Sequence, residues 1–170
     1  MSRLTPPAGA DDHAQGALDS PLVLVEYGDF ECLYCGLAYP ELKAVQRAMG
    51  DELCFVFRHF PLREVHPHAE RAAELSEAAA TVGRFWDMHD TLYENQTALS
   101  DRDLVEYAQR LDLDEDLIDS ARLGRFAARI QRDVSSGARS GVNSTPCLFL
   151  NGTRYDGPVI AASLMRSLRS

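Results

Sequence analysis

The chain has 170 residues and a hydrophobic fraction of 45%, which suits one globular domain with a full core. Its net charge of −9 argues against nucleic acid or an anionic membrane as the main partner. No apolar run is long enough to span a bilayer, and residues 1–7 lack the apolar segment of a signal peptide. We therefore expect a cytoplasmic protein.

The first third of the chain has the pattern of a strand–helix–strand unit. Residues 1–20 are rich in Pro, Gly, Ala and Asp, and we interpret them as a loose arm that can include one short edge strand. The apolar run 22–27 predicts a buried strand, 32–49 a helix, and 53–58 a second buried strand. The helix positions with core-like spacing are Leu37, Val45 and Met49. Because one helix joins the two strands, we expect them to be parallel.

The middle of the chain is predicted to be helical over about residues 65–140. Pro67 stands where a first helix would begin, and an aromatic segment from Phe85 to Tyr93 predicts a second. Ser100 with Asp103 resembles a capping box, and Asp114 is a typical N-cap for another short helix. A further helix should have its apolar residues at Phe126, Ile130 and Val134 and end between Gly137 and Gly141. This pattern indicates a compact all-helical block inserted between strands.

The end of the chain returns to strand patterning. Residues 147–150 and 153–155 predict two antiparallel strands, joined by Asn151-Gly152, which is the strongest short hairpin signal. A final helix should follow Pro158. The residues that should share its buried face are Ile160, Leu164 and Leu168.

Two cysteines, Cys32 and Cys35, lie at the junction between the first strand and the first helix. Backbone N–H groups and the helix dipole favour negative charge there, so we expect a stabilised thiolate at Cys32. Cys35 lies one turn further on and can resolve a mixed disulfide. Half of a zinc site is the alternative interpretation, but structural zinc usually needs four ligands. Cys54 and Cys147 are isolated on different predicted strands, and we expect them to be small buried hydrophobes.

Three motifs suggest a family. They are Val25-Glu26-Tyr27-Gly28-Asp29-Phe30-Glu31-Cys32-Leu33-Tyr34-Cys35-Gly36, Arg58-His59-Phe60-Pro61-Leu62 and Gly141-Val142-Asn143-Ser144-Thr145-Pro146. With the order of elements, they resemble the DsbA-like thiol–disulfide oxidoreductases. The resemblance implies an α/β, thioredoxin-like fold: a mixed central sheet flanked by helices, with an all-helical insertion, in a single domain over 1–170. Leu33 stands where relatives commonly have proline, and Cys147 where a small or hydroxylated residue is more usual.

The resemblance also implies the activity. Cys32 would exchange disulfides with protein or peptide thiols, Cys35 would resolve the mixed disulfide, and an unidentified redox partner would restore the pair. No organic cofactor or metal is expected. We expect mainly a reductase or isomerase, because a cytosolic poise keeps ordinary dithiols reduced. Two alternatives remain open: a non-catalytic peptide-binding or chaperone module, and a glutathione-dependent transferase or isomerase on a related fold.

Further site residues follow from the resemblance. Glu26 interrupts an apolar strand, so it is either an edge carboxylate facing water or a buried group that accepts the proton of Cys35; the resemblance favours the second. Thr145 and a cis Pro146 should form the wall of a substrate groove, with Cys147 turned away. The remaining residues assigned to substrate binding are Leu33, Tyr34 and His59, although His59 is equally consistent with a hydrogen-bonded position at the core edge. The five histidines are not expected to form a metal-ligand set.

Overall fold

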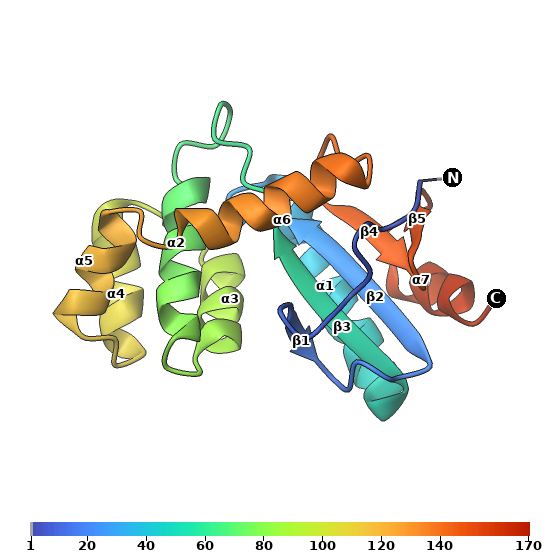
Figure 1. Ribbon diagram of the computed structural model, residues 1–170. Coiled ribbons are helices and arrows are strands. Elements are labelled where there is room, and N and C mark those ends of the chain that lie inside the picture. Colours follow the sequence, from blue (N-terminus) through green and yellow to red (C-terminus); the bar gives the residue numbers. More distant parts are fainter. Residues whose placement is uncertain (1) are drawn as a thin grey trace.

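The computed structural model describes residues 2–170, which form a five-stranded mixed sheet with helices around it (Figure 1). The strand order is β1–β3–β2–β4–β5; β2 and β3 are parallel, and the other neighbours are antiparallel. The strands are β1 His13–Gln15, β2 Leu22–Gly28, β3 Leu53–His59, β4 Cys147–Leu150 and β5 Thr153–Tyr155. The helices are α1 Leu33–Met49, α2 Ala69–Ala80, α3 Phe85–Glu94, α4 Asp101–Arg110, α5 Glu115–Arg122, α6 Ala127–Arg139 and α7 Ala161–Leu168, with a 3-10 turn at Gly50–Glu52. Within residues 2–170, no helix combines the length and apolar character needed to cross a membrane.

The first helix, α1, joins the parallel strands β2 and β3 as the sequence predicts, with Cys32 as its N-cap. Its buried residues are Cys35, Ala38, Leu42, Val45 and Met49. The prediction for Leu37 was wrong, because this side chain is 62% exposed. The core face follows Cys35, Ala38 and Leu42 at helical spacing, which turns Leu37 toward solvent.

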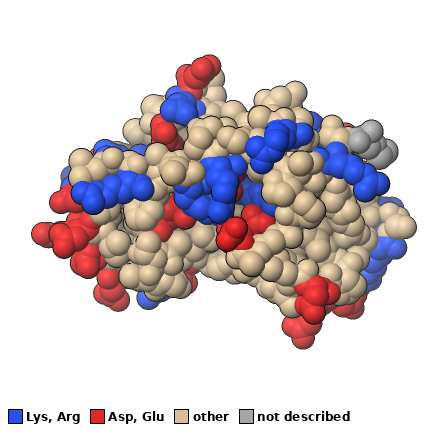
Figure 2. Space-filling view, in the orientation of Figure 1, with Lys and Arg blue, Asp and Glu red and all other residues tan. Residues whose placement is uncertain are grey.

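The helical insertion comprises α2 to α6 and lies between β3 and β4, to one side of the sheet (Figure 1). The capping box of Ser100 with Asp103 and the N-cap Asp114 are both present. The α6 helix runs through Gly137 and ends at Arg139. It buries Ile130 as predicted, whereas Val134 and the N-cap residue Phe126 are half-buried. Figure 2 shows acidic side chains gathered at the end of the molecule formed by α4 and α5, while basic side chains lie along α6.

The N-terminal arm is fixed to the sheet, in contrast to the expectation of a loose segment. Leu4 is buried, β1 pairs with the outer edge of β3, and Arg3 bridges to Thr153 on β5 at the opposite edge. Arg58 on β3 donates hydrogen bonds to the carbonyls of Pro6 and Pro7 and to both carboxylate oxygens of Asp12. These contacts satisfy a buried guanidinium, so the arm is part of the folded core rather than an appendage.

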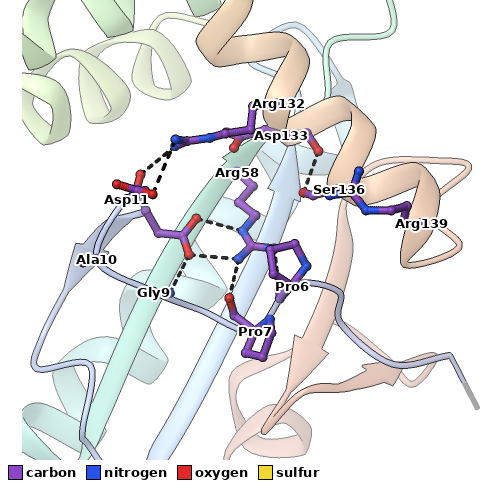
Figure 3. Close-up of a pocket in the computed structure, with 11 residues that line it drawn as sticks. Pro6, Pro7, Gly9, Ala10, Asp11, Arg58, Arg132, Asp133, Ser136 and Arg139 are labelled. Atoms are coloured by element: carbon purple, nitrogen blue, oxygen red, sulfur yellow. Dashed lines mark hydrogen bonds and ion pairs between the residues drawn. The ribbon is translucent and has the colours of Figure 1, made fainter.

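A pocket of about 250 Å³ lies between this arm and α6 (Figure 3). Its charged groups largely pair with one another. Arg58 binds Asp12, and Arg132 donates to the carbonyl of Asp11 at 2.9 Å. We therefore interpret this pocket as the seam where the arm meets the helix.

The C-terminal hairpin turns at Asn151-Gly152, as predicted, and both residues have positive φ angles of 49° and 80°. The last helix, α7, packs against α1 and β2 through buried Leu164 and Leu168. Ile160 was predicted for the same face. It is instead the N-cap of α7 and is exposed, because the helix begins after it.

Candidate active site

Cys32 is the N-cap residue of α1, in an extended conformation that ends the loop after β2. Its backbone N–H donates to the carbonyl of Asp29 at 3.1 Å, and its carbonyl accepts from the N–H of Gly36 at 3.0 Å. The sulfur therefore lies at the N-terminus of the helix, where free N–H groups favour an anion. Cys32 is 4% exposed.

The surroundings of the Cys32 sulfur favour its thiolate form. A hydrogen bond from the Cys35 thiol lowers the pKa of Cys32 to about 5, together with contacts to Thr145 and to the backbone N–H groups of Cys35 and Tyr34, although burial raises it. In the thiol form, Sγ donates to the carbonyl of Thr145 at 3.4 Å. An ionised Cys32 near neutral pH has the reactivity that thiol–disulfide exchange requires.

The second cysteine, Cys35, is fully buried one turn further along α1, and its pKa is raised well above the ordinary value, chiefly by burial. The pKa values of the two thiols thus differ in the direction expected of an attacking thiol, Cys32, and a resolving thiol, Cys35. All four cysteines of the chain are free thiols in this structure. Cys54 and Cys147 are buried on β3 and β4, as expected of small core residues.

Glu26 lies on the central strand β2, opposite Phe57 of β3 and Leu148 of β4. It is 2% exposed, so the interpretation as an edge carboxylate facing water is wrong. Burial, together with the charge of Cys32, raises its pKa from 4.5 to about 8. No hydrogen-bond partner for Oε1 is found among residues 2–170, so this oxygen is available to receive a proton.

The loop before β4 faces the cysteine pair. The Thr145–Pro146 peptide bond is cis, and the carbonyl of Thr145 contacts the Cys32 sulfur. Thr145 itself is buried. Cys147 follows on β4, where it pairs in register with Tyr27 and packs with the opposite layer of the core. A third thiol is thereby kept away from the redox pair by strand alternation.

Two residues that the sequence analysis did not single out hold the loop of Cys32. The buried carboxylate of Asp29 accepts from the backbone N–H groups of Glu31 and Leu62 and contacts His66 Nδ1 at 2.7 Å. Gln96, after α3, donates from Nε2 to the carbonyl of Cys32 at 2.6 Å. Gln96 is 64 residues from Cys32, so no local pattern could identify it.

Apolar side chains are exposed on the first turns of α1, next to the cysteine pair in sequence. Leu33 and Tyr34 are both exposed, and Leu37 joins them one turn further along α1. Val65, in the segment between β3 and α2, is also exposed.

His59 is not part of this surface. It is 1% exposed and its Nε2 lies 2.7 Å from Oε1 of Glu77, so it is a hydrogen-bonded core histidine and we withdraw its assignment to the groove. The aromatic segment of α3 is likewise core, with Phe85, Met88 and Tyr93 buried.

A Cys-x-x-Cys pair at the start of a helix beside a mixed sheet, with the Thr145 carbonyl in contact with the first sulfur, is the arrangement of the thioredoxin fold. The chain belongs to the thioredoxin family, because the family model with that description matches residues 9–169. The resemblance to the DsbA-like branch is confirmed at the level of the fold.

Solved structures support this assignment. BdbD from Bacillus subtilis superimposes with a TM-score of 0.84 at 19% identity, covering 99% of this chain and 96% of that one. The α-DsbA1 protein of Wolbachia pipientis gives 0.82 at 17% identity, covering 99% and 94%. These likenesses establish that the helical insertion is part of a shared architecture.

Among curated proteins, a sequence named Na(+)/H(+) antiporter NhaA 3 from Salinispora tropica is 44% identical over 162 residues. The match covers 94% of this chain and 24% of the relative. The chain thus spans about a quarter of the length of that relative.

Proposed function

We propose that this domain is a thiol–disulfide oxidoreductase that exchanges disulfides with protein or peptide substrates. The observation that carries the proposal is the contrast between Cys32 and Cys35: adjacent thiols, one with its pKa lowered to about 5 and the other with its pKa raised. Such a contrast assigns the attack to one sulfur and the resolution to the other.

In the reducing direction, the Cys32 thiolate attacks one sulfur of a substrate disulfide. A bond forms between Cys32 and that sulfur, and the second substrate sulfur leaves and takes a proton. In the mixed disulfide Cys32 carries no charge, so the part of the rise in the pKa of Glu26 that this charge causes is relieved. The ionised form of Glu26 then accepts the proton of Cys35, and Cys35 attacks Cys32 Sγ, which releases the first substrate sulfur. The substrate gains two electrons and two protons, and the domain is left with a Cys32–Cys35 disulfide. The reverse sequence oxidises a substrate dithiol.

The substrates that fit this site are extended protein segments. The Thr145 backbone beside Cys32 supports strand-like pairing that tolerates many sequences, and the exposed Leu33 and Tyr34 support apolar contact. The proposal concerns this domain alone, which matches about a quarter of the length of the antiporter-named relative. Cytoplasmic placement stays a prediction.

An insulin-reduction assay with Cys32→Ser tests the activity. We expect Cys32→Ser to abolish turnover and Cys54→Ser, a matched change at a buried cysteine on β3, to retain it. A domain that protects unfolded proteins from aggregation equally well with and without Cys32, and does not reduce insulin, would be the non-catalytic module instead. Conjugation of glutathione to an electrophilic substrate, without reduction of insulin, would indicate the transferase.

A further inference from the structure

Two imidazoles and one carboxylate from three separate elements converge beneath the N-terminal arm. His13 lies on β1, His59 ends β3, and Glu77 lies on α2. The Nε2 atoms of His13 and His59 are 2.6 Å and 2.7 Å from the same oxygen, Oε1 of Glu77. The three potential ligand atoms all lie within 4.8 Å of one another.

We propose that His13, His59 and Glu77 bind a divalent transition-metal ion of the zinc class. Two imidazole nitrogens and one carboxylate oxygen are a donor set that zinc accepts, with water completing the coordination. Ligand atoms at roughly 2.0–2.1 Å from a tetrahedral ion are about 3.3 Å apart, so side-chain shifts of an ångström or so would suffice. This proposal departs from the expectation that the histidines form no ligand set. The three residues are far apart in sequence, and His13 lies in the arm that seemed loose.

Aromatic packing holds both imidazoles in place. The His13 ring stacks on Phe85 with centroids 3.6 Å apart and an interplanar angle of 7°. The His59 ring meets Phe57 edge-on, with centroids 5.4 Å apart. Because neighbouring rings fix these orientations, the ligand atoms lose little side-chain freedom when an ion binds.

The charge around the cluster favours a cation. Glu77 supplies a carboxylate that is 6% exposed and whose Oε1 contacts both imidazole nitrogens. Arg129 lies 4.0 Å from Glu77 Oε2 but binds Asp133 at 2.5 Å, and each of these two charges offsets the other. Glu74, also on α2 and buried, lies near Glu77, and burial raises its pKa. The carboxylate of Glu77 is therefore the anionic group that would attract the ion.

The tautomers of the two imidazoles and the exposure of the cluster are both compatible with binding of an ion. A carboxylate only accepts hydrogen bonds, so each imidazole carries its proton on Nε2 when it donates to Glu77. To bind an ion, each ring must carry the proton on Nδ1 instead, which neutral histidine permits. The His13 side chain is 16% exposed, so an ion and a water ligand can reach the cluster from that side.

A bound ion would join β1 to both β3 and α2. Its expected effect is therefore on stability, with the arm held to the sheet edge more firmly. The cluster uses neither cysteine, so this inference does not depend on the proposed redox function.

The test is zinc titration of the Cys32→Ser/Cys35→Ser variant, which removes the exchange-active thiols as competing ligands. After dialysis against a chelator, we expect calorimetry to show one equivalent of zinc bound and the melting temperature to rise with zinc concentration. Cobalt should give the absorption bands of a tetrahedral site with nitrogen and oxygen ligands. His13→Ala and Glu77→Gln should each weaken zinc binding by roughly tenfold or more.

Two further variants make the result decisive. His68→Ala changes an exposed histidine near the start of α2 and should bind zinc as the parent does. His13→Gln keeps a hydrogen-bond donor for Glu77 but is a poor ligand, so it tests binding even if His13→Ala unfolds. The proposal is overturned if the parent binds no zinc, or if His13→Gln and Glu77→Gln bind it with unchanged affinity.

Discussion

Gly36 and Gln96 fit together at the start of the redox helix: a β-carbon at position 36 would lie 2.1 Å from Oε1 of Gln96. The close approach lets Gln96 reach across and donate from Nε2 to the carbonyls of Phe30 and Cys32. A residue of the helical insertion, between α3 and α4, thus holds the backbone of the loop that presents the attacking sulfur.

Removing the two hydrogen bonds that Gln96 donates to this loop should alter the reactivity of Cys32 more than the stability of the fold. We expect Gln96→Ala and the near-isosteric Gln96→Glu to raise the pKa of Cys32, because the loop loses its anchor and the carboxylate adds negative charge. The measurement is the pH dependence of alkylation at Cys32. Gln131→Ala, a matched change on exposed α6, is the control. Identical alkylation profiles in all variants would assign Gln96 a purely structural role.

Gly36→Ala should have opposite effects in two backgrounds. In the wild type, alanine must displace Gln96 and should destabilise the folded state. In the Gln96→Ala background, the space is free and alanine should stabilise the helix by about 1 kcal/mol, the difference in helix propensity. Urea unfolding of the four proteins gives the coupling between the two sites. Additive effects would show that the contact does not restrict position 36.

The Cys35 thiol should contribute to the low pKa of Cys32 by donating a hydrogen bond. Serine retains a donor at this position and alanine does not. We therefore expect alkylation of Cys32 to be half-maximal at a pH of about 5 in the wild type. This midpoint should rise more in Cys35→Ala than in Cys35→Ser. Equal midpoints in the two variants would mean that helix N–H groups alone stabilise the thiolate.

Glu26 should govern both proton transfer and the pH dependence of stability. Its pKa rises from 4.5 to about 8 in the fold, so the stabilisation from its protonated form is complete below pH 4.5 and is lost as pH rises through about 8. Glu26→Gln cannot ionise, so its free energy of unfolding relative to wild type should increase between about pH 5 and pH 9. Urea unfolding across this range measures the effect.

The same variant should slow the attack of Cys35 on a mixed disulfide near neutral pH, because the proton acceptor is gone. Glu31→Gln changes a half-buried carboxylate beside Cys32 and is the matched control. If both variants resolve the mixed disulfide at the wild-type rate, Glu26 has no part in proton transfer.

The reduction potential should be intermediate. A pKa of about 5 for Cys32 lies between the roughly 7 of thioredoxin and the roughly 3.5 of DsbA. A more stable thiolate makes the disulfide more oxidising, so we expect a potential between about −270 and −120 mV. Equilibration with glutathione buffers provides the value. A result near −120 mV would contradict the prediction of a net reductase or isomerase.

Local chemistry made much of the fold predictable. The N-cap at Asp114 and the hairpin at Asn151-Gly152 depend on neighbouring residues, and both are present. The position of Cys32 likewise follows from the change of pattern between strand and helix. By contrast, the orientation of Leu37 depends on which helix face meets the sheet. The hydrogen-bond partners of Cys32 and Glu77 come from distant segments, so no periodic pattern in the sequence indicates them.

The path of the N-terminal arm has a consequence for association between molecules. Residues 2–4 hydrogen-bond to the hairpin of β4 and β5 at one side of the sheet, and His13–Gln15 pair with β3 at the other (Figure 1). A bare strand edge is a template on which a second chain can add a strand, the usual first step of sheet aggregation. The arm thus covers the edge of β3 with a strand of only 3 residues and contacts the hairpin at the other border, so a copy trimmed at its N-terminus would expose a longer strand edge and become prone to self-assembly.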